Sequence, residues 1–312
     1  MKNKILTGLL LVLIGGWGSL SAQNVGSNYA RQVNTLIGTK GVGLNSGYLY
    51  PGATYPYGMV QFTPSYFSKR SGFVINQLSG GGCEHMGNFP TFPVKGKLKM
   101  SPDNILNYRI NISEEKGHAG YYEAMVQEDI KAKLTVTERT GMASYEYPAD
   151  QQYGTVIIGG GISATPIEQA AIVITAPNKC EGYAEGGNFC GLRTPYKVYF
   201  VAEFDTDALE SGTWKRDELK PNTTFAEGEY SGVYFTFDVN KKKNIQYKIG
   251  VSYVSVENAR ENLKTENSGW DFLQIQNQAE SKWNHYLGMI EVEGTNPDRT
   301  TQFYTHLYRS FI

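Results

Sequence analysis

The fold is decided by the stretch Tyr121-Tyr-Glu-Ala-Met-Val126 and its neighbour Ile130-Lys-Ala-Lys-Leu-Thr-Val136, along which apolar and polar residues alternate. Such alternation is typical of strands with one buried face. Further segments with the same character follow at 143–147, 155–158, 171–174, 197–204, 233–237 and 246–254. Many short strands with no helices between them predict a mainly β protein, built as a two-sheet antiparallel β-sandwich.

The pattern changes to helices after residue 254. Ser255 is the predicted N-cap of a helix over 255–264, and a second helix is expected from Ser268 to about Leu287. A short strand at 289–292 and a third helix over 298–312 complete the expected elements. The predicted domains are therefore a sandwich at 23–254, a helical linker at 255–296 and the start of a helical domain at 297–312.

The third helix carries no sequence signal for a C-terminal cap, and it ends on the apolar pair Phe311-Ile312. This favours the chain being the first part of a longer protein, with the third helix as the start of a truncated helical domain. A C-terminal helix docked on the sandwich is the alternative.

Residues 1–22 have the pattern of a secretory signal peptide. Lys2 and Lys4 precede an apolar run over 5–14, and small residues lead to a cleavage site after Ala22. The run is shorter than the roughly 20 residues that a membrane span needs. We therefore expect an exported protein, periplasmic or extracellular, with no membrane anchor after cleavage.

Composition excludes some partners. The net charge is −1, which argues against nucleic acid or another polyanion held by bulk electrostatics. The 35 glycines and 22 tyrosines suit a β-rich protein that handles sugars, and equally an ordinary sandwich that uses Tyr in strands.

Three cysteines allow one disulfide. Cys180 and Cys190 enclose a Gly-rich segment that reads as a loop, and in an oxidising compartment this pair is expected to be bonded. Cys83 is then expected to be a buried, unreactive thiol, because no base pairs with it in the sequence.

Several segments of the chain resemble glycoside hydrolase family 92, whose members are calcium-dependent exo-α-mannosidases. The most specific is Tyr50-Pro-Gly-Ala-Thr-Tyr-Pro-Tyr-Gly-Met-Val-Gln61, which is preceded by Val33-Asn-Thr-Leu-Ile-Gly-Thr39 and followed by Leu78-Ser-Gly-Gly-Gly-Cys83. Similar segments continue to Phe303-Tyr-Thr-His-Leu-Tyr-Arg-Ser310, so the resemblance covers essentially the whole mature chain.

The resemblance implies an N-terminal β-sandwich followed by a C-terminal (α/α)6 barrel that carries the catalytic carboxyl groups. It also implies hydrolysis of α-linked mannose with inversion, a mannose-containing glycan as substrate, and Ca²⁺ as cofactor. On this reading the chain has no catalytic residue and no metal ligand of its own, and the calcium ligands lie mainly in the barrel.

The family's active site lies where sandwich loops meet the barrel, so the Gly-rich loops are the candidate glycan-binding residues. The loop at Gly80, Gly81 and Gly82 would let backbone approach a sugar, or would simply be a tight turn. The remaining candidates are Cys83, Glu84, His85, Asn88 and Tyr66, and the segment 38–47 is a candidate second wall. A surface position is the alternative for His85.

The chain departs from the family pattern in two places. Family members often carry Gly-Phe-Ser-His-Thr-His-Leu-Ser-Gly, whereas this chain has Gly72-Phe-Val-Ile-Asn-Gln-Leu-Ser-Gly80, with Ile75 and Gln77 at the histidine positions.

Many members also carry a Trp-Asp pair upstream, whereas here no Trp lies between Trp17 and Trp214, and the nearest aromatic pair is Tyr66-Phe67. An aromatic wall stacks on a sugar face, so its change puts linkage preference and mannose specificity in doubt. A non-catalytic glycan-binding sandwich is the alternative function.

Overall fold

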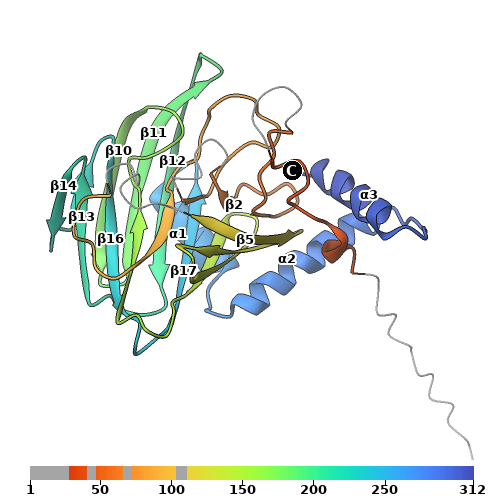
Figure 1. The fold of residues 1–312 in the computed structure, drawn as a ribbon. Coiled ribbons are helices and arrows are strands. Elements are labelled where there is room, and N and C mark those ends of the chain that lie inside the picture. The colour runs from red at the N-terminus through yellow and green to blue at the C-terminus, as the bar shows by residue number, and fades with distance from the viewer. Residues whose placement is uncertain (1–27, 41–46, 66–71, 103–110) are drawn as a thin grey trace, which may run out of the picture.

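A computed structural model describes residues 28–40, 47–65, 72–102 and 111–312, and it confirms the predicted two-sheet antiparallel sandwich (Figure 1). In these residues, one sheet has eight strands in the order β1-β2-β3-β4-β9-β16-β13-β14. The other has nine, in the order β15-β10-β11-β12-β17-β8-β7-β6-β5. The predicted signal peptide lies outside the described residues. No helix among those described is long and apolar enough to cross a membrane.

The strands and helices have the following bounds. The eight-stranded sheet contains β1 (Ala53–Thr54), β2 (Gln61–Pro64), β3 (Phe73–Val74), β4 (Thr91–Lys95), β9 (Tyr153–Ile158), β13 (Glu210–Lys215), β14 (Glu218–Pro221) and β16 (Ser231–Asp238). The nine-stranded sheet contains β5 (Ile112–His118), β6 (Tyr121–Val126), β7 (Ile130–Val136), β8 (Thr140–Glu146), β10 (Ile167–Ala176), β11 (Lys179–Phe189), β12 (Leu192–Phe204), β15 (Phe225–Glu227) and β17 (Asn244–Ser252). The helices are η1 (Tyr29–Gln32), α1 (Val256–Glu266), α2 (Phe272–Leu287) and α3 (Pro297–Arg309).

The alternating segments form strands because alternate side chains enter the space between the two sheets. Along β6 every second residue is buried, and β6 pairs antiparallel with β7 in a register that sets Tyr122 opposite Leu134. The shared core is rich in aromatic rings. Phe204 of β12 packs against Phe235 and Phe237 of β16, with ring centroids 4.9 and 5.0 Å away. Apolar burial between the sheets is the main stabilising contribution of such a core.

The predicted cap of the first helix is confirmed, while the second and third helices have other bounds than expected. Ser255 accepts a hydrogen bond from the backbone N–H of Asn258 and caps α1. The second helix begins at Phe272 rather than Ser268, because Asp271 is its N-cap and Trp270 packs over the Lys248 ammonium at 4.3 Å. Residues 289–292 form no strand. The third helix ends at Arg309, where the Ser310 N–H bonds back to carbonyls of the last turn.

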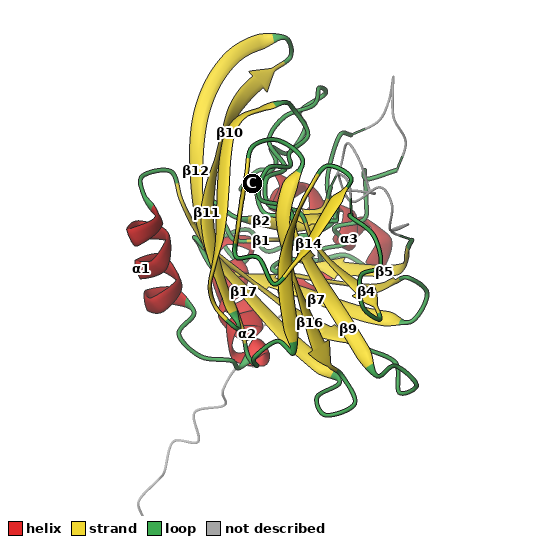
Figure 2. Cartoon of the chain, turned by 90° about the vertical axis from the view of Figure 1, so that its left-hand side faces the viewer, coloured by secondary structure: helices red, strands yellow, loops and turns green. Residues whose placement is uncertain are grey.

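The helices lie on two sides of the sandwich. α1 covers the outer face of β12 and β17, while α2 and α3 lie at the end of the sandwich near η1 (Figures 1 and 2). A second apolar cluster joins α2 and α3 to the N-terminal segment: Ala30, Val33, Ala119, Trp283, Leu287, Tyr304 and Tyr308. Within it, the Trp283 indole N–H donates to the Thr54 carbonyl at 2.7 Å. The helices are therefore packed onto the sandwich rather than tethered to it.

A buried carboxylate strengthens this junction. Glu280 of α2, whose side chain is 7% exposed, accepts hydrogen bonds from Arg31 at 3.1 and 3.2 Å and from Gln276 at 2.7 Å. Its Oε1 also lies 2.8 Å from Nε2 of His118. Burial alone would raise the pKa of Glu280, but the hydrogen bonds from His118, Arg31 and Gln276 outweigh it and lower that pKa to about 2.

Candidate functional site

The Gly-rich segment forms a loop between β3 and β4, and two asparagines close its base. The Asn76 amide donates to Asn88 Oδ1 at 3.1 Å, and the Asn88 backbone N–H donates to Asn76 Oδ1 at 2.8 Å. The Gly87 N–H adds a bond to the Asn76 carbonyl at 2.7 Å. These bonds bring residues twelve positions apart into contact and fix the two ends of the loop.

Asn88 is completely buried, so it supports the loop from beneath. Its Oδ1 also accepts a hydrogen bond from the Tyr196 hydroxyl of β12 at 2.7 Å. Burial raises the pKa of Tyr196, which keeps this hydroxyl protonated as a donor. The predicted role of Asn88 as a direct sugar contact remains a prediction, and the structure shows it as the link between loop and sheet.

His85 is also buried, at 2% exposure, so it is not the surface residue that was the alternative expectation. The Leu78 backbone N–H donates to His85 Nε2 at 2.8 Å. Because Nε2 accepts, Nδ1 holds the proton and donates to the Cys83 carbonyl at 2.7 Å. One imidazole thus closes the loop across residues 78–85 and sets its curvature.

The expected disulfide is wrong in one partner. Cys83 is bonded to Cys190, with a Cα–Cα distance of 5.4 Å, and Cys180 is a free, buried thiol. The segment between Cys180 and Cys190 is strand β11 instead of a loop. A strand rises by about 3.3 Å per residue, so its two ends stand roughly 30 Å apart, far beyond disulfide reach.

The tip of the loop is where the molecule offers backbone to a ligand. Gly80 has φ +77°, and a Cβ built there would meet no atom within 4 Å. A Cβ on Gly81 would lie 2.7 Å from the His85 ring, so only glycine fits beside the imidazole. Gly82 and Glu84 are exposed. Tyr66 and residues 41–46 of the predicted second wall lie outside the described residues.

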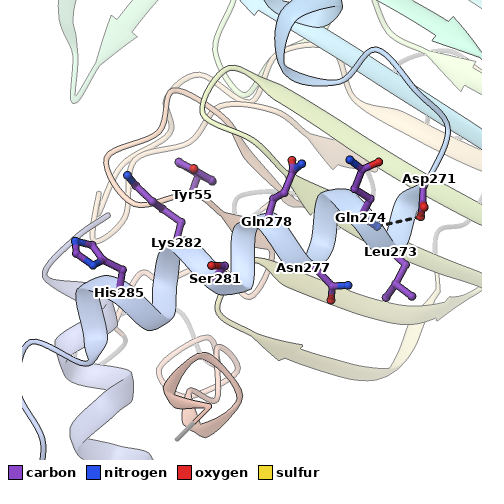
Figure 3. A pocket seen from close by; sticks show the side chains of 9 residues that line it. All are labelled: Tyr55, Asp271, Leu273, Gln274, Asn277, Gln278, Ser281, Lys282 and His285. Atoms are coloured by element: carbon purple, nitrogen blue, oxygen red, sulfur yellow. Dashed lines mark hydrogen bonds between the residues drawn. The ribbon is translucent and has the colours of Figure 1, made fainter. Parts of the chain in front are cut away.

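A second candidate region runs along α2 and was not predicted. It is a shallow, open hollow of about 800 Å³ lined by Tyr55, Asp271, Leu273, Gln274, Asn277, Gln278, Ser281, Lys282 and His285. Gln274, Gln278 and Lys282 lie one turn apart and point to the side of the helix where Tyr55 lies (Figure 3). Their four-residue spacing indicates that they share one face of the helix. The prediction of this helix rested only on its apolar stripe and did not use this polar face.

Each region carries one acidic side chain. Glu84 is the single carboxyl group of the loop between Asn76 and Asn88. In the hollow, the only acidic side chain is Asp271, and its Oδ1 already caps α2 by accepting from the Gln274 N–H at 3.0 Å. Neither region pairs a general acid with a general base. The described part of the chain also holds no group of three or more His, Cys, Asp or Glu side chains placed to bind a metal.

Comparison with known families assigns this fold. The model of the glycosyl hydrolase family 92 N-terminal domain matches residues 32–252, which is more than half of the chain. The chain belongs to glycosyl hydrolase family 92. The model of the family 92 catalytic domain matches residues 258–312, which include most of α1 and all of α2 and α3.

Individual relatives of this family 92 chain agree with that assignment. It is 26% identical to an uncharacterised secreted glycosidase from Arthroderma benhamiae, over 97% of this chain and 44% of the relative. A family GH92 α-mannosidase from Bacteroides thetaiotaomicron has the same fold, with a TM-score of 0.80 and 24% identity over 91% of this chain and 41% of that one. An inverting GH92 mannosidase from the same species matches with a TM-score of 0.76 and 23% identity, over 91% and 39%.

The chain therefore spans less than half of the length of the relatives it matches. The N-terminal domain model matches residues 32–252 and the catalytic domain model matches the 55 residues 258–312.

Proposed function

We propose that this chain is the N-terminal part of an exported family 92 α-mannosidase. In this proposal the sandwich loops form one wall of the active site and bind a terminal α-linked mannose, and we call this binding their gripping role. Hydrolysis with inversion takes place at carboxyl groups from the rest of the catalytic domain, an (α/α)6 barrel. The solved relatives of this fold include an inverting mannosidase, and a curated relative is described as secreted.

One observation supports the proposal: the N-terminal domain model matches 221 residues, 32–252, while the catalytic domain model matches only the 55 residues 258–312. An inverting glycosidase needs two carboxyl groups about 6.5–9.5 Å apart, one to protonate the leaving oxygen and one to activate water. The loop between Asn76 and Asn88 supplies only Glu84. A single carboxylate can accept hydrogen bonds from sugar hydroxyls, but it cannot act as both acid and base on opposite faces of the bond.

Calcium enters the proposal as a family property. The described residues hold no group of three or more acidic, His or Cys side chains placed to bind a metal, and Ca²⁺ takes six to eight oxygen ligands, several of them carboxylates. We therefore place the calcium ligands outside these residues, and the role proposed for this chain uses no metal.

Activity of the purified chain tests whether the catalytic carboxyl groups lie outside it. With Ca²⁺ present, the chain is expected to release no mannose from 4-nitrophenyl α-mannoside. The reason is that the loop between Asn76 and Asn88 supplies one carboxyl group, whereas inverting hydrolysis needs an acid and a base. Clear turnover by the pure chain would show that the acid and base lie within it.

Calorimetry with α-mannobiose tests the gripping role, with millimolar affinity as the expected result. Glu84→Gln is expected to weaken binding by about tenfold, because a hydrogen bond to a charged group is worth about 1.5–3 kcal/mol. Glu227→Gln, an exposed carboxyl on edge strand β15, is the matched control and is expected to bind normally. Absence of binding, or an equal loss in both variants, would contradict a gripping role for this loop.

A glycan-binding module without hydrolysis is the second candidate, favoured by the open space beside Gly80, where a Cβ would meet no atom within 4 Å. Hydrolysis of α-mannosides by a longer protein distinguishes the two candidate functions. A protein that extends this chain through the whole catalytic domain hydrolyses α-mannosides if the first is right, and binds them without turnover if the second is right.

A further inference from the structure

The Cys83–Cys190 disulfide joins the glycine-rich loop to a distant hairpin. Cys190 lies at the turn between β11 and β12, and the bond closes a span of 107 residues. The β11–β12 hairpin extends beyond its neighbouring strands (Figure 2). Its end is still paired beyond a register shift between Gly186 and Asn188, with Asn188 opposite Arg193 and Phe189 opposite Leu192. The bond thus attaches the loop to the paired end of an arm of the nine-stranded sheet.

The rest of the loop tip is sparsely packed. A Cβ on Gly80 would meet no atom within 4 Å, and one on Gly82 would meet only the Tyr48 ring, at 3.9 Å. One backbone bond reaches the tip, from the Gly80 N–H to the Tyr48 carbonyl at 2.9 Å. His85 closes the loop internally, and its ring reaches the same hairpin by an edge contact with Phe189, at 5.4 Å between centroids. His85 is two residues from Cys83, and Phe189 is next to Cys190. The ring contact therefore depends on the geometry that the disulfide sets.

The third cysteine does not compete for this bond. Cys180 is fully buried, and burial raises the pKa of its thiol far above the usual range. A thiol that is neither ionised nor exposed does not attack a neighbouring disulfide. Cys190 is exposed and Cys83 is partly exposed, so a small thiol can reach their bond. Redox chemistry in the folded chain is therefore confined to one pair.

We propose that Cys83 and Cys190 are positioning residues for the glycan-binding loop, which keeps its binding shape only while the disulfide is oxidised. The inference rests on the proposed gripping role of this loop and adds to it a dependence on redox conditions. In an oxidising compartment the loop is fastened to the hairpin and presents the backbone of Gly80 and Gly82 together with Glu84. In a reducing one it is released while both sheets stay folded.

The chemical step is a thiol–disulfide exchange with a dithiol such as dithiothreitol. A thiolate of the reductant attacks one sulfur, the S–S bond breaks, and the departing cysteine thiolate takes up a proton. The second thiol of the reductant then displaces the other cysteine. Two electrons and two protons reach the protein as two thiols, and the reductant leaves as its cyclic disulfide.

Hydrogen exchange of the purified chain tests the inference directly. On reduction, and in the Cys83→Ser/Cys190→Ser variant, amide exchange over residues 78–85 and 187–193 is expected to rise by at least about tenfold, as for a segment that loses a local anchor. Exchange in β7, β8 and β17 is expected to stay the same. Reoxidation is expected to restore protection, and Cys180→Ala is expected to respond to reduction like the parent chain. Unchanged exchange over 78–85 on reduction would overturn the proposal, as would equal loss of protection in the core strands.

Titration with methyl α-mannopyranoside adds the functional readout. The oxidised chain is expected to bind, and the reduced chain to bind at least about tenfold more weakly, with binding restored by reoxidation. Equal affinity in both states would overturn the positioning role. If the oxidised chain does not bind at all, the gripping function fails, and the exchange experiment still decides whether the disulfide orders the loop.

Discussion

The sandwich core and the glycine-rich loop are held together by different forces. In the core, Phe204 is completely buried and touches rings from both sheets. In the loop, the Cβ position of Gly80 is open, and the structure depends on the bond from the Gly80 N–H to the Tyr48 carbonyl, the His85 bonds, the Asn76–Asn88 pair and one disulfide. The core is stabilised by many small contacts, the loop by a few directional ones.

This difference predicts how each region fails. Removing one side chain from a dense core leaves a cavity and lowers the free energy of unfolding of the whole sandwich, because the two sheets share that core. Removing one bond from the loop releases a surface segment and leaves the sheets intact. A binding loop gains from the second arrangement, since its shape can be set by residues that contribute little to global stability.

The largest expected effect comes from Phe204→Ala in β12. This substitution is expected to lower the free energy of unfolding by about 3–5 kcal/mol, the range for Phe→Ala in a close-packed core. Phe225→Ala in β15 of the same sheet is the matched control, because Phe225 is 54% exposed. Its expected loss is about 0.5 kcal/mol or less. Urea unfolding at constant m-value measures both.

Similar losses in the two phenylalanine variants would break the distinction between a shared core and a sheet edge. Preserved hydrogen-exchange protection of residues 78–85 in Phe204→Ala, below the unfolding transition, would sharpen it, because the loop would then be shown to depend on its own bonds.

An intermediate effect is expected at Glu280, which is buried like a core residue but held by directional bonds. Its pKa is about 2 in the folded chain, below the ordinary value of 4.5. The unfolded chain therefore binds this proton first as the pH falls. The carboxylate's stabilisation is full above about pH 4.5 and is lost as the pH falls toward 2, by up to about 3 kcal/mol.

Glu280→Gln removes this dependence. We expect the variant to be less stable than the parent chain at pH 7 by about 1–3 kcal/mol, and the difference to shrink at pH 3. Urea midpoints at the two pH values measure it, with Glu227→Gln as the exposed control. A gap between variant and parent that is as wide at pH 3 as at pH 7 would show that the contribution of Glu280 is packing instead of charge.

The sandwich was predictable because its signal is local. β6 and β7 were predicted with the bounds that the structure has, since alternation along each strand reports the buried face directly. The cap at Ser255 was equally local. The start of α2 was not, because the position of Trp270 is decided by a distant partner, Lys248 of β17.

Strand β11 shows why the disulfide could not be predicted. Its glycines suggested a loop, yet they are required by close strand packing. A Cβ at Gly182 would lie 2.1 Å from the Ala171 carbonyl oxygen, and one at Gly187 would lie 2.0 Å from that of Thr194. Spacing in the sequence favoured Cys180 as the partner, whereas the hairpin brings Cys190 to Cys83 across 107 residues.

The exposure of some candidate-site residues could be predicted, whereas the hydrogen-bond partners of the others could not. Gly80, Gly82 and Glu84 were expected to be available to a ligand, and they lie at an open or exposed tip. His85 was expected either to bind sugar, which stays a prediction, or to lie at the surface, whereas it is buried and accepts a hydrogen bond from the Leu78 N–H. Which polar groups face inward depends on tertiary partners such as Tyr196, which no local pattern reports.

The smallest expected effect tests the loop tip itself, through two glycines that both have open space where a side chain would go. Gly80 has φ +77°, while Gly269, just before α2, has no left-handed φ. Gly80→Ala is expected to lower stability by about 1 kcal/mol, because an alanine Cβ is strained in that conformation. Gly269→Ala is expected to be neutral or stabilising by up to about 1 kcal/mol, because it restricts only the unfolded chain. Thermal unfolding of both variants beside the parent gives the sign of each change. A neutral Gly80→Ala would mean that the tip relaxes freely, and the loop would then be even less coupled to the core than its few bonds suggest.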